Sequence, residues 1–203
     1  MVTVGKNVSE VERRLAAGLL ACPSCEGRLG PWGHTQPRGL RGLEGAVVRC
    51  RPRRTRCVGC GVTHVLLPVN ALCRRADEAG VIGAGLVLAA AGWGHRRIAD
   101  RLGRPAATAR GWMRRVRARA EGLRAGFTGL LVAVAPDPVL PAPAGSGLAD
   151  AVAAIVAAAV ATVARWGAAV SGLSPWELGA AVSAGQLLSP PGTPMSINTS
   201  RPW

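Results

Sequence analysis

The pattern of hydrophobic and polar positions separates an N-terminal part with short apolar runs from a longer part with helical periodicity. Residues 8–20 show the apolar spacing of a short amphipathic helix. From residue 28 to 68 the apolar runs are short and are interrupted by glycine and proline, which is typical of β-structure with tight turns. A three-stranded ribbon is therefore expected, with residues 39–45 as a loop. Its strands are expected at residues 46–50, 54–57 and 62–68.

Helical periodicity begins near Asp77 and predicts three helices in succession. Residues 79–91 are almost entirely apolar, which suits a first helix that is buried. Glycines end that segment, and the next two helices are expected over residues 95–102 and 105–123.

Four prolines between residues 134 and 147 predict a linker in front of a C-terminal helical pair. An Ala- and Val-rich helix is expected over residues 148–166. The second helix is expected to begin at Ser174-Pro175-Trp176-Glu177, which combines a capping box with proline at the first helical position. The Pro- and Ser-rich residues 189–203 are expected to be disordered.

No membrane partner is expected from the distribution of apolar residues. The longest uncharged apolar run, residues 151–164, covers 14 residues, whereas a helix that spans a bilayer needs about 20. Residues 1–20 contain several charged side chains and no sustained apolar core, so no signal peptide is predicted. A cytoplasmic, nucleoid-associated location follows as the expectation.

Two Cys-x-x-Cys pairs, Cys22 with Cys25 and Cys57 with Cys60, can supply four thiolates to one tetrahedral zinc ion. In a reducing cytosol such pairs bind metal more often than they form disulfides. Gly61 directly follows the second pair, as the sharp turn of a cysteine knuckle requires, whereas the glycine after the first pair comes one residue later. Four protein ligands close the coordination sphere, so the predicted Zn²⁺ is structural and not catalytic.

Three further side chains are spare candidates for this site. Cys50 has no partner at knuckle spacing and is expected on a strand, and Cys73 is expected to be a small buried residue. His64 could replace one of the four cysteines. The sequence leaves open whether Cys50, Cys73 or His64 contributes to the metal site.

The segment around residues 94–119 has the features of a helix-turn-helix. Ala99 and Gly103 supply the small residue and the turn glycine that this motif needs, and Pro105 opens the second helix. Arg104 is a departure, because an apolar residue often follows the glycine. The apolar face of the second helix is expected from Ala109, Trp112 and Val116.

A recognition helix reads bases with its N-terminal residues, while flanking residues bind phosphate. The residues expected to face the major groove are Ala106, Ala107, Arg110 and Arg114. Base-specific contacts are expected mainly from Arg110 and Arg114, because alanine offers apolar contacts alone. Phosphate contacts are expected from Arg96, Arg97, Arg115, Arg117 and Arg119. The alternative is an ordinary helical hairpin with a solvated arginine face.

The net charge of +14 is concentrated in the first two thirds of the chain. Residues 1–75 carry +9, residues 76–130 carry +6, and residues 131–203 carry −1. A basic surface of this size attracts a polyanion, and double-stranded DNA is the expected partner. The acidic residues after the helix-turn-helix are scattered over a linker and two helices, so no catalytic carboxylate group and no enzyme activity are predicted.

Several stretches together resemble a family of small, uncharacterised actinobacterial proteins that carry a domain of unknown function. Its members pair a Cys-Pro-x-Cys…Cys-x-x-Cys ribbon with a helix-turn-helix. The order of modules is also similar to the N-terminal DNA-binding part of insertion-element transposases, where ribbon and helix-turn-helix bind element ends. The resemblance covers residues 20–200 and implies an architecture more than a role. The matching stretches are Cys22-Pro-Ser-Cys25, 53–60, 63–68 and 103–115.

The expected fold class is mainly α with a small β zinc ribbon. The expected divisions are a zinc ribbon at 20–70, a helix-turn-helix unit at 76–126, the linker at 134–147, a helical pair at 148–188 and a tail at 189–203. Two functions remain open. One is a DNA-binding transcription regulator or transposition-associated factor. The other is a scaffold that binds a protein or RNA through the ribbon and the C-terminal helices, which could also mediate a homodimer. The DNA target, the oligomeric state and the role of those helices are not determined by the sequence.

Overall fold

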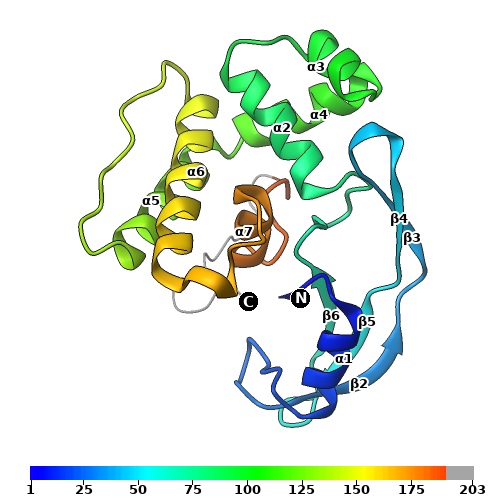
Figure 1. Cartoon of the computed structure of the whole chain (residues 1–203). Helices are drawn as coiled ribbons and strands as arrows, with labels where there is room; N and C mark the ends of the chain where they lie inside the picture. The colour runs from blue at the N-terminus through cyan, green and yellow to red at the C-terminus, as the bar shows by residue number, and fades with distance from the viewer. Residues whose placement is uncertain (191–203) are drawn as a thin grey trace.

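The computed structural model describes residues 1–190. An N-terminal part with two small sheets lies beside a larger helical part (Figure 1). The predicted helices and the cysteine-bearing β-segment are both present, but the β-structure is more extensive than predicted. With seven α-helices and a mixed four-stranded sheet in the described residues, the fold is mixed α/β rather than mainly α.

The larger sheet has the strand order β1-β6-β5-β2. β1 (Val2–Val4) runs parallel to β6 (Thr63–Pro68), whereas β5 (Arg53–Cys57) pairs antiparallel with both β6 and β2 (Leu29–His34). Helix α1 (Val8–Ala16) packs on this sheet and is N-capped by the side chain of Asn7, which accepts the Glu10 N–H. The small core between them consists of Val4, Val11, Leu15, Leu20, Cys22, Leu29, Cys57 and Leu66.

A separate hairpin replaces the third strand of the predicted ribbon. β3 (Arg38–Arg41) pairs with β4 (Val47–Cys50), and a 3₁₀ turn, η1 (Leu43–Gly45), joins them. The predicted strand at 46–50 thus exists but does not pair with β5, and the predicted loop at 39–45 begins as a strand. The physical reason is the burial of Leu40 against Leu67 and Ala71, which anchors β3 beside the end of β6.

The predicted three-helix unit is present as α2 (Ala79–Ala90), α3 (His95–Leu102) and α4 (Ala106–Arg117). The helix predicted over 105–123 is, however, interrupted at residues 118–119, and α5 (Ala120–Val134) follows. At the break, Arg119 turns inward and donates to the carbonyls of Gln186 and Ser189, at 3.0 and 3.3 Å. The phosphate contact expected of Arg119 stays a prediction, with Nη1 of its guanidinium directed to these two carbonyls.

The C-terminal helical pair is α6 (Gly147–Trp166), continued by η2 (Gly167–Ala169), and α7 (Pro175–Val182). The predicted capping box is confirmed. The Ser174 hydroxyl accepts the Glu177 N–H at 3.3 Å, and the Glu177 carboxylate accepts the Ser174 N–H at 2.8 Å. Of the residues predicted to be disordered, 191–203 lie outside the described part.

Side chains from α2, α4, α5, α6 and α7 share one hydrophobic core, in which Ile82, Leu123, Phe127 and Ile155 are almost fully buried. Residues 147–169 are long and apolar enough to cross a membrane, but half of the 18-residue apolar window within them is buried inside the protein. α6 packs against α2, α5 and α7, so its apolar composition is accounted for by this core.

A buried ion pair joins the hairpin to the helical part. Asp77, just before α2, accepts hydrogen bonds from Arg41 of β3, each 3.0 Å long. Its carboxylate also accepts the Nε–H of Arg104 at 2.8 Å, and Arg104 in turn donates to the Gly42 carbonyl. Asp77 and Arg104 are 3 % and 6 % exposed, so this cluster fixes the hairpin against the turn between α3 and α4.

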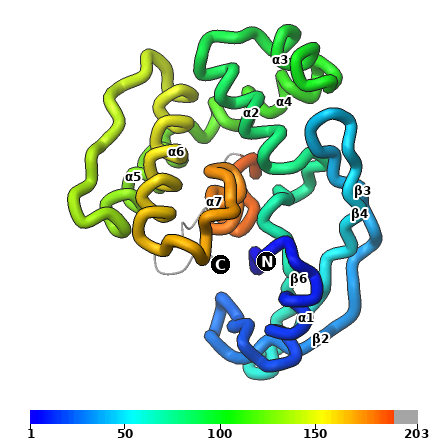
Figure 2. The backbone as a smooth tube through the Cα atoms, in the orientation of Figure 1, coloured from blue at the N-terminus to red at the C-terminus, as the bar shows by residue number. Residues whose placement is uncertain are grey.

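The N-terminal strand also contacts the helical part. Figure 2 shows the blue start of the chain beside the orange α7. The Thr3 hydroxyl lies 3.4 Å from the Ala180 carbonyl, to which it donates, and Lys6 pairs with Glu177 at 2.9 Å.

The close approach of α2 and α7 at Gly83 gives a first testable expectation. A Cβ added to Gly83 would lie 2.0 Å from Cγ of Trp176, so Gly83→Ala forces the indole to move. We expect a loss of about 1–3 kcal/mol in the free energy of unfolding, measured by urea denaturation. Gly80→Ala in the same helix is the matched control, because nothing lies within 4 Å of its added Cβ. It should be neutral or stabilising, and equal losses in the two variants would contradict the packing argument.

Candidate metal centre

The first cysteine knuckle lies between α1 and β2. Its loop closes through hydrogen bonds of 2.8 Å from the Cys22 N–H to the Gly27 carbonyl and from the Glu26 N–H to the Cys22 carbonyl. Glu26 adopts φ 59°, so the left-handed position falls on a non-glycine residue. The glycine comes one place later because a Cβ at Gly27 would lie 3.1 Å from the Cys57 sulfur. The delayed glycine therefore makes room for the second knuckle.

The second knuckle follows β5. Gly61 has φ 72° and its N–H donates to the Cys57 carbonyl at 3.1 Å, as expected for the sharp turn. The Cys60 N–H points at the Cys57 sulfur at 3.5 Å. An N–H···S contact of this kind is the usual support of a metal-bound thiolate.

The four predicted cysteines come together, with their sulfurs within 4.8 Å of one another. The Cys22–Cys60 and Cys25–Cys57 sulfur separations are 3.8 and 3.4 Å. Four thiolates at about 2.3 Å from one tetrahedral ion are separated by roughly 3.8 Å, so the cluster fits a single ion. Cys22 and Cys57 are buried, whereas Cys25 and Cys60 face the solvent, which leaves one side open for a metal to enter.

The acid–base properties of the thiols also fit a site for a cation. The Cys60 N–H lowers the pKa of Cys57 to about 6. For Cys25, the Gly27 N–H lowers the pKa, but the sulfurs of Cys60 and Cys57 outweigh it and raise the pKa to about 12. Sulfurs this close cannot all ionise without positive charge between them. A divalent metal ion supplies that charge and would hold all four as thiolates.

The buried side chain of His64 contacts the cysteine cluster. It is 6 % exposed, with Nε2 3.3 Å from the Cys22 sulfur and Nδ1 3.3 Å from the amino group of Met1. Both contacts are satisfied when the Nε2–H donates to the sulfur and Nδ1 accepts from the ammonium. Burial raises the pKa of the Cys22 thiol, but hydrogen bonds from the N–H groups of Ser24 and Cys25 outweigh this effect. The pKa of Cys22 is therefore lower than its ordinary value.

The two spare cysteines lie outside this group. Among the described residues, the metal-competent cluster contains Cys22, Cys25, Cys57 and Cys60 alone. Cys50 ends β4, on a strand as predicted, and Cys73 lies half-buried with its sulfur 3.2 Å from that of Met1. Burial raises the pKa of both Cys50 and Cys73, so neither thiol is poised to ionise.

The predicted recognition helix presents a continuous exposed face. Its five exposed members fall within a sector of about 100° at 100° per residue, and we call this set the α4 basic face. The opposite side packs into the core through Ala109, Trp112, Met113 and Val116. The α4 basic face consists of Ala106, Ala107, Arg110, Arg114 and Arg117.

The remaining predicted contact residues Arg96, Arg97 and Arg115 are not part of this face. Arg96 and Arg97 are exposed at the start of α3, and the guanidinium of Arg97 stacks 3.6 Å from the ring centre of Trp93. Arg115 is half-buried and donates to the Gly111 carbonyl at 3.0 Å, so it lies outside the sector of the α4 basic face.

The turn between α3 and α4 contains a residue whose role sequence reasoning missed. Gly103 takes the left-handed conformation, with φ 60°, and Ala99 is buried beneath it. Arg104 follows, and its ion pair with Asp77 explains why this position is not apolar. No local signal in the sequence links two residues 27 positions apart.

No family model, curated protein or solved structure matches the chain.

Proposed function

We propose that this protein binds double-stranded DNA through α4 and is held in shape by a structural zinc ion. The observation that carries the proposal is the α4 basic face, where three arginines stand on one exposed side of a helix that follows a tight glycine turn. A transcription regulator or a transposition-associated factor is the role that this combination favours.

The zinc assignment is supported by the donor set. Soft thiolate ligands select zinc among the common divalent ions, and four of them leave no position for a substrate. The ion would therefore hold the two knuckles together and perform no chemistry. The residues that would bind it are Cys22, Cys25, Cys57 and Cys60, with His64 hydrogen-bonded to one sulfur.

The DNA interaction is supported by the identity and exposure of the α4 side chains. Arginine pairs with the O6 and N7 atoms of guanine in the major groove, and Ala106 and Ala107 leave room for the backbone to approach. Trp112 and Val116 anchor the other side of the helix, 3 % and 2 % exposed. The helix is thus fixed to the core while its arginines face outward.

Arg110→Ala is expected to weaken binding to a selected duplex site by about 1–3 kcal/mol. Arg117→Ala, near the C-terminal end of the helix, should weaken binding to all duplexes alike. It should also reduce the slope of log affinity against log salt concentration by about 1, as expected for the loss of one phosphate contact. The site is first selected from random duplex DNA with the zinc-loaded protein, and affinities are then measured by fluorescence anisotropy at several salt concentrations.

Arg124→Ala is the matched control for these variants. Arg124 is an exposed arginine on α5 that pairs with Glu121 at 2.7 Å and lies outside α4. It should leave DNA affinity unchanged. Absence of salt-sensitive duplex binding by the zinc-loaded protein would refute the proposal.

A scaffold that binds a protein or RNA is the second candidate, and exposed apolar groups near the knuckles favour it. Trp32 on β2 is 52 % exposed, with Arg56 stacked 4.9 Å from its ring centre, and Val58 in the second knuckle is 67 % exposed. Trp32→Ala should then abolish capture of that partner while DNA affinity stays normal. Loss of duplex binding in Trp32→Ala would instead assign this surface to DNA.

A further inference from the structure

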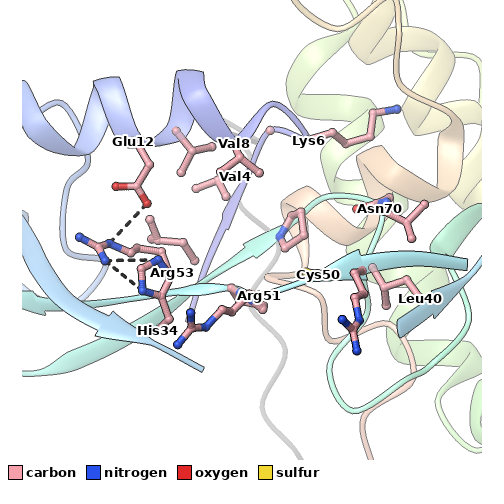
Figure 3. Close-up of a pocket in the computed structure, with 17 residues that line it drawn as sticks. Val4, Lys6, Val8, Glu12, His34, Leu40, Cys50, Arg51, Arg53 and Asn70 are labelled. Atoms are coloured by element: carbon pink, nitrogen blue, oxygen red, sulfur yellow. Dashed lines mark hydrogen bonds and ion pairs between the residues drawn. The ribbon is translucent and has the colours of Figure 1, made fainter. Parts of the chain in front are cut away.

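A cavity of about 230 Å³ lies between α1, the four-stranded sheet and the β3–β4 hairpin. It is separate from the cysteine cluster, whose four ligands are not among its lining residues. Figure 3 shows Val4 and Val8 on one side of the cavity and His34, Arg51 and Arg53 on another. The two sides thus differ in chemistry.

The apolar side is formed by aliphatic groups from five elements. Val8 of α1 is 73 % exposed and Val48 of β4 is 51 % exposed, so neither is covered by the rest of the described chain. Leu40 and Leu66 form the buried floor. An apolar group placed here would remove the exposed valines from water, which is favourable. The aliphatic lining residues are Val4, Val8, Val11, Leu40, Val48 and Leu66.

The polar side is cationic. Lys6 pairs with Glu177 at 2.9 Å, and the Nε of Arg53 lies 3.4 Å from the Glu12 carboxylate without a hydrogen bond between them. Arg49 and Arg51 are exposed and have no acidic partner within 4.0 Å among the described residues. Arg51 therefore brings an uncompensated guanidinium to the rim of the cavity, whereas Arg49 alternates with Val48 along β4 and its side chain lies on the opposite face of the hairpin.

Arg53 adds an unsatisfied donor to the same wall. The Nη1 of Arg53 lies 3.2 Å from a ring nitrogen of His34 and donates to the Gly33 carbonyl at 3.4 Å. Its Nε is buried, and although the Glu12 carboxylate is near, the geometry is not that of a hydrogen bond. A buried donor without an acceptor is costly, and an anionic group in the cavity would supply one.

We propose that this cavity binds a small organic anion with an apolar body, such as a short-chain or single-ring carboxylate or phosphate ester. Its volume equals that of roughly eight water molecules, which admits one ring or a short aliphatic chain with one anionic group. The apolar body lies against the valines and leucines, and the anion is bound by Arg51 and Arg53. A nucleic-acid phosphate would contact the arginines of this site but would leave its apolar floor uncovered, so a ligand with an apolar body fits the cavity better.

The test is isothermal titration calorimetry of the full, metal-loaded chain with octanoate and with phenyl phosphate. We expect saturable 1:1 binding of at least one of them. Octanol, which lacks the charge, and inorganic phosphate, which lacks the apolar body, should each bind at least about tenfold more weakly, as expected for loss of one charge-assisted contact or of the buried carbons. Preference for octanoate assigns a carboxylate ligand, and preference for phenyl phosphate assigns a phosphate ester.

Variants locate the binding. Arg51→Glu and Val8→Asp, on the two sides of the cavity, should each weaken binding of the preferred probe at least about tenfold. Arg54→Glu is the matched control, because this exposed arginine neighbours Arg53 but does not line the cavity. Metal content and melting temperature verify that every variant is folded.

Two outcomes overturn the proposal. One is no saturable binding of either probe at millimolar concentration. The other is equal binding of probe and octanol together with an unchanged affinity in Arg51→Glu. The titrations contain no DNA, so they stand whether or not α4 binds a duplex.

Discussion

Cys57→Ser is expected to release the metal ion and to unfold the four-stranded sheet while the helical core stays folded. Cys57 is both a predicted ligand and a buried member of the N-terminal core. That core contains only eight buried side chains, too few to stabilise a sheet of this kind without a staple. Structural zinc sites in small peptides have apparent binding free energies of about 10–16 kcal/mol. Loss of this binding free energy is therefore expected to unfold the four-stranded sheet.

Two measurements follow this change separately. Metal content by mass spectrometry should fall from one equivalent per chain to none. Amide hydrogen exchange should lose protection in β2, β5 and β6 but keep it in α5 and α6, because the helices have a core of their own. Cys50→Ser is the control and should retain the ion, since Cys50 lies outside the cluster. A metal-loaded Cys57→Ser protein with native protection would contradict the assignment.

Asp77→Asn is expected to produce the largest loss of stability in the helical part. The substitution keeps the shape of the side chain but removes the charge that compensates Arg41 and Arg104. Arg104 is nearly buried, so it would be left as an unpaired interior cation. Breaking a buried ion pair in this way costs about 3–5 kcal/mol, which urea denaturation followed by circular dichroism measures directly.

An exposed carboxylate provides the control. Glu121 pairs with Arg124 three residues away at the surface, with side chains that are 76 % and 46 % exposed. Pairs of this kind are screened by water, so Glu121→Gln should leave the unfolding curve unchanged. Equal effects of the two substitutions would show that burial around Asp77 does not isolate the pair from solvent.

The elements that the sequence predicted best are those fixed by local chemistry. The Cys-x-x-Cys turns place their own sulfurs together, and the start of α7 is determined by Ser174 and Glu177 within one helical turn. Likewise, the glycine turn after Ala99 separates α3 from α4 whatever surrounds it. In each case the interacting residues are neighbours in the chain.

The elements that were missed depend on distant partners. β1 and β3 have three and four residues, too few for a periodic pattern, and they are strands because β6 and β4 lie beside them. The helix break at residues 118–119 interrupts an intact helical pattern because Arg119 reaches carbonyls 67 and 70 positions ahead. The hairpin position likewise depends on Asp77, which no local motif connects to Arg41.

The contacts of the first strand have a consequence for how the protein is made. Thr3 bonds to Ala180, and Lys6 pairs with Glu177, so these early residues cannot complete their contacts until α7 has left the ribosome. The four clustered cysteines, by contrast, all lie before residue 61. The cysteine cluster can therefore form while the nascent chain is still short, whereas these contacts of β1 require α7. Contacts between such distant residues form slowly, so we expect the docking of β1 on α7 to be a late step in folding.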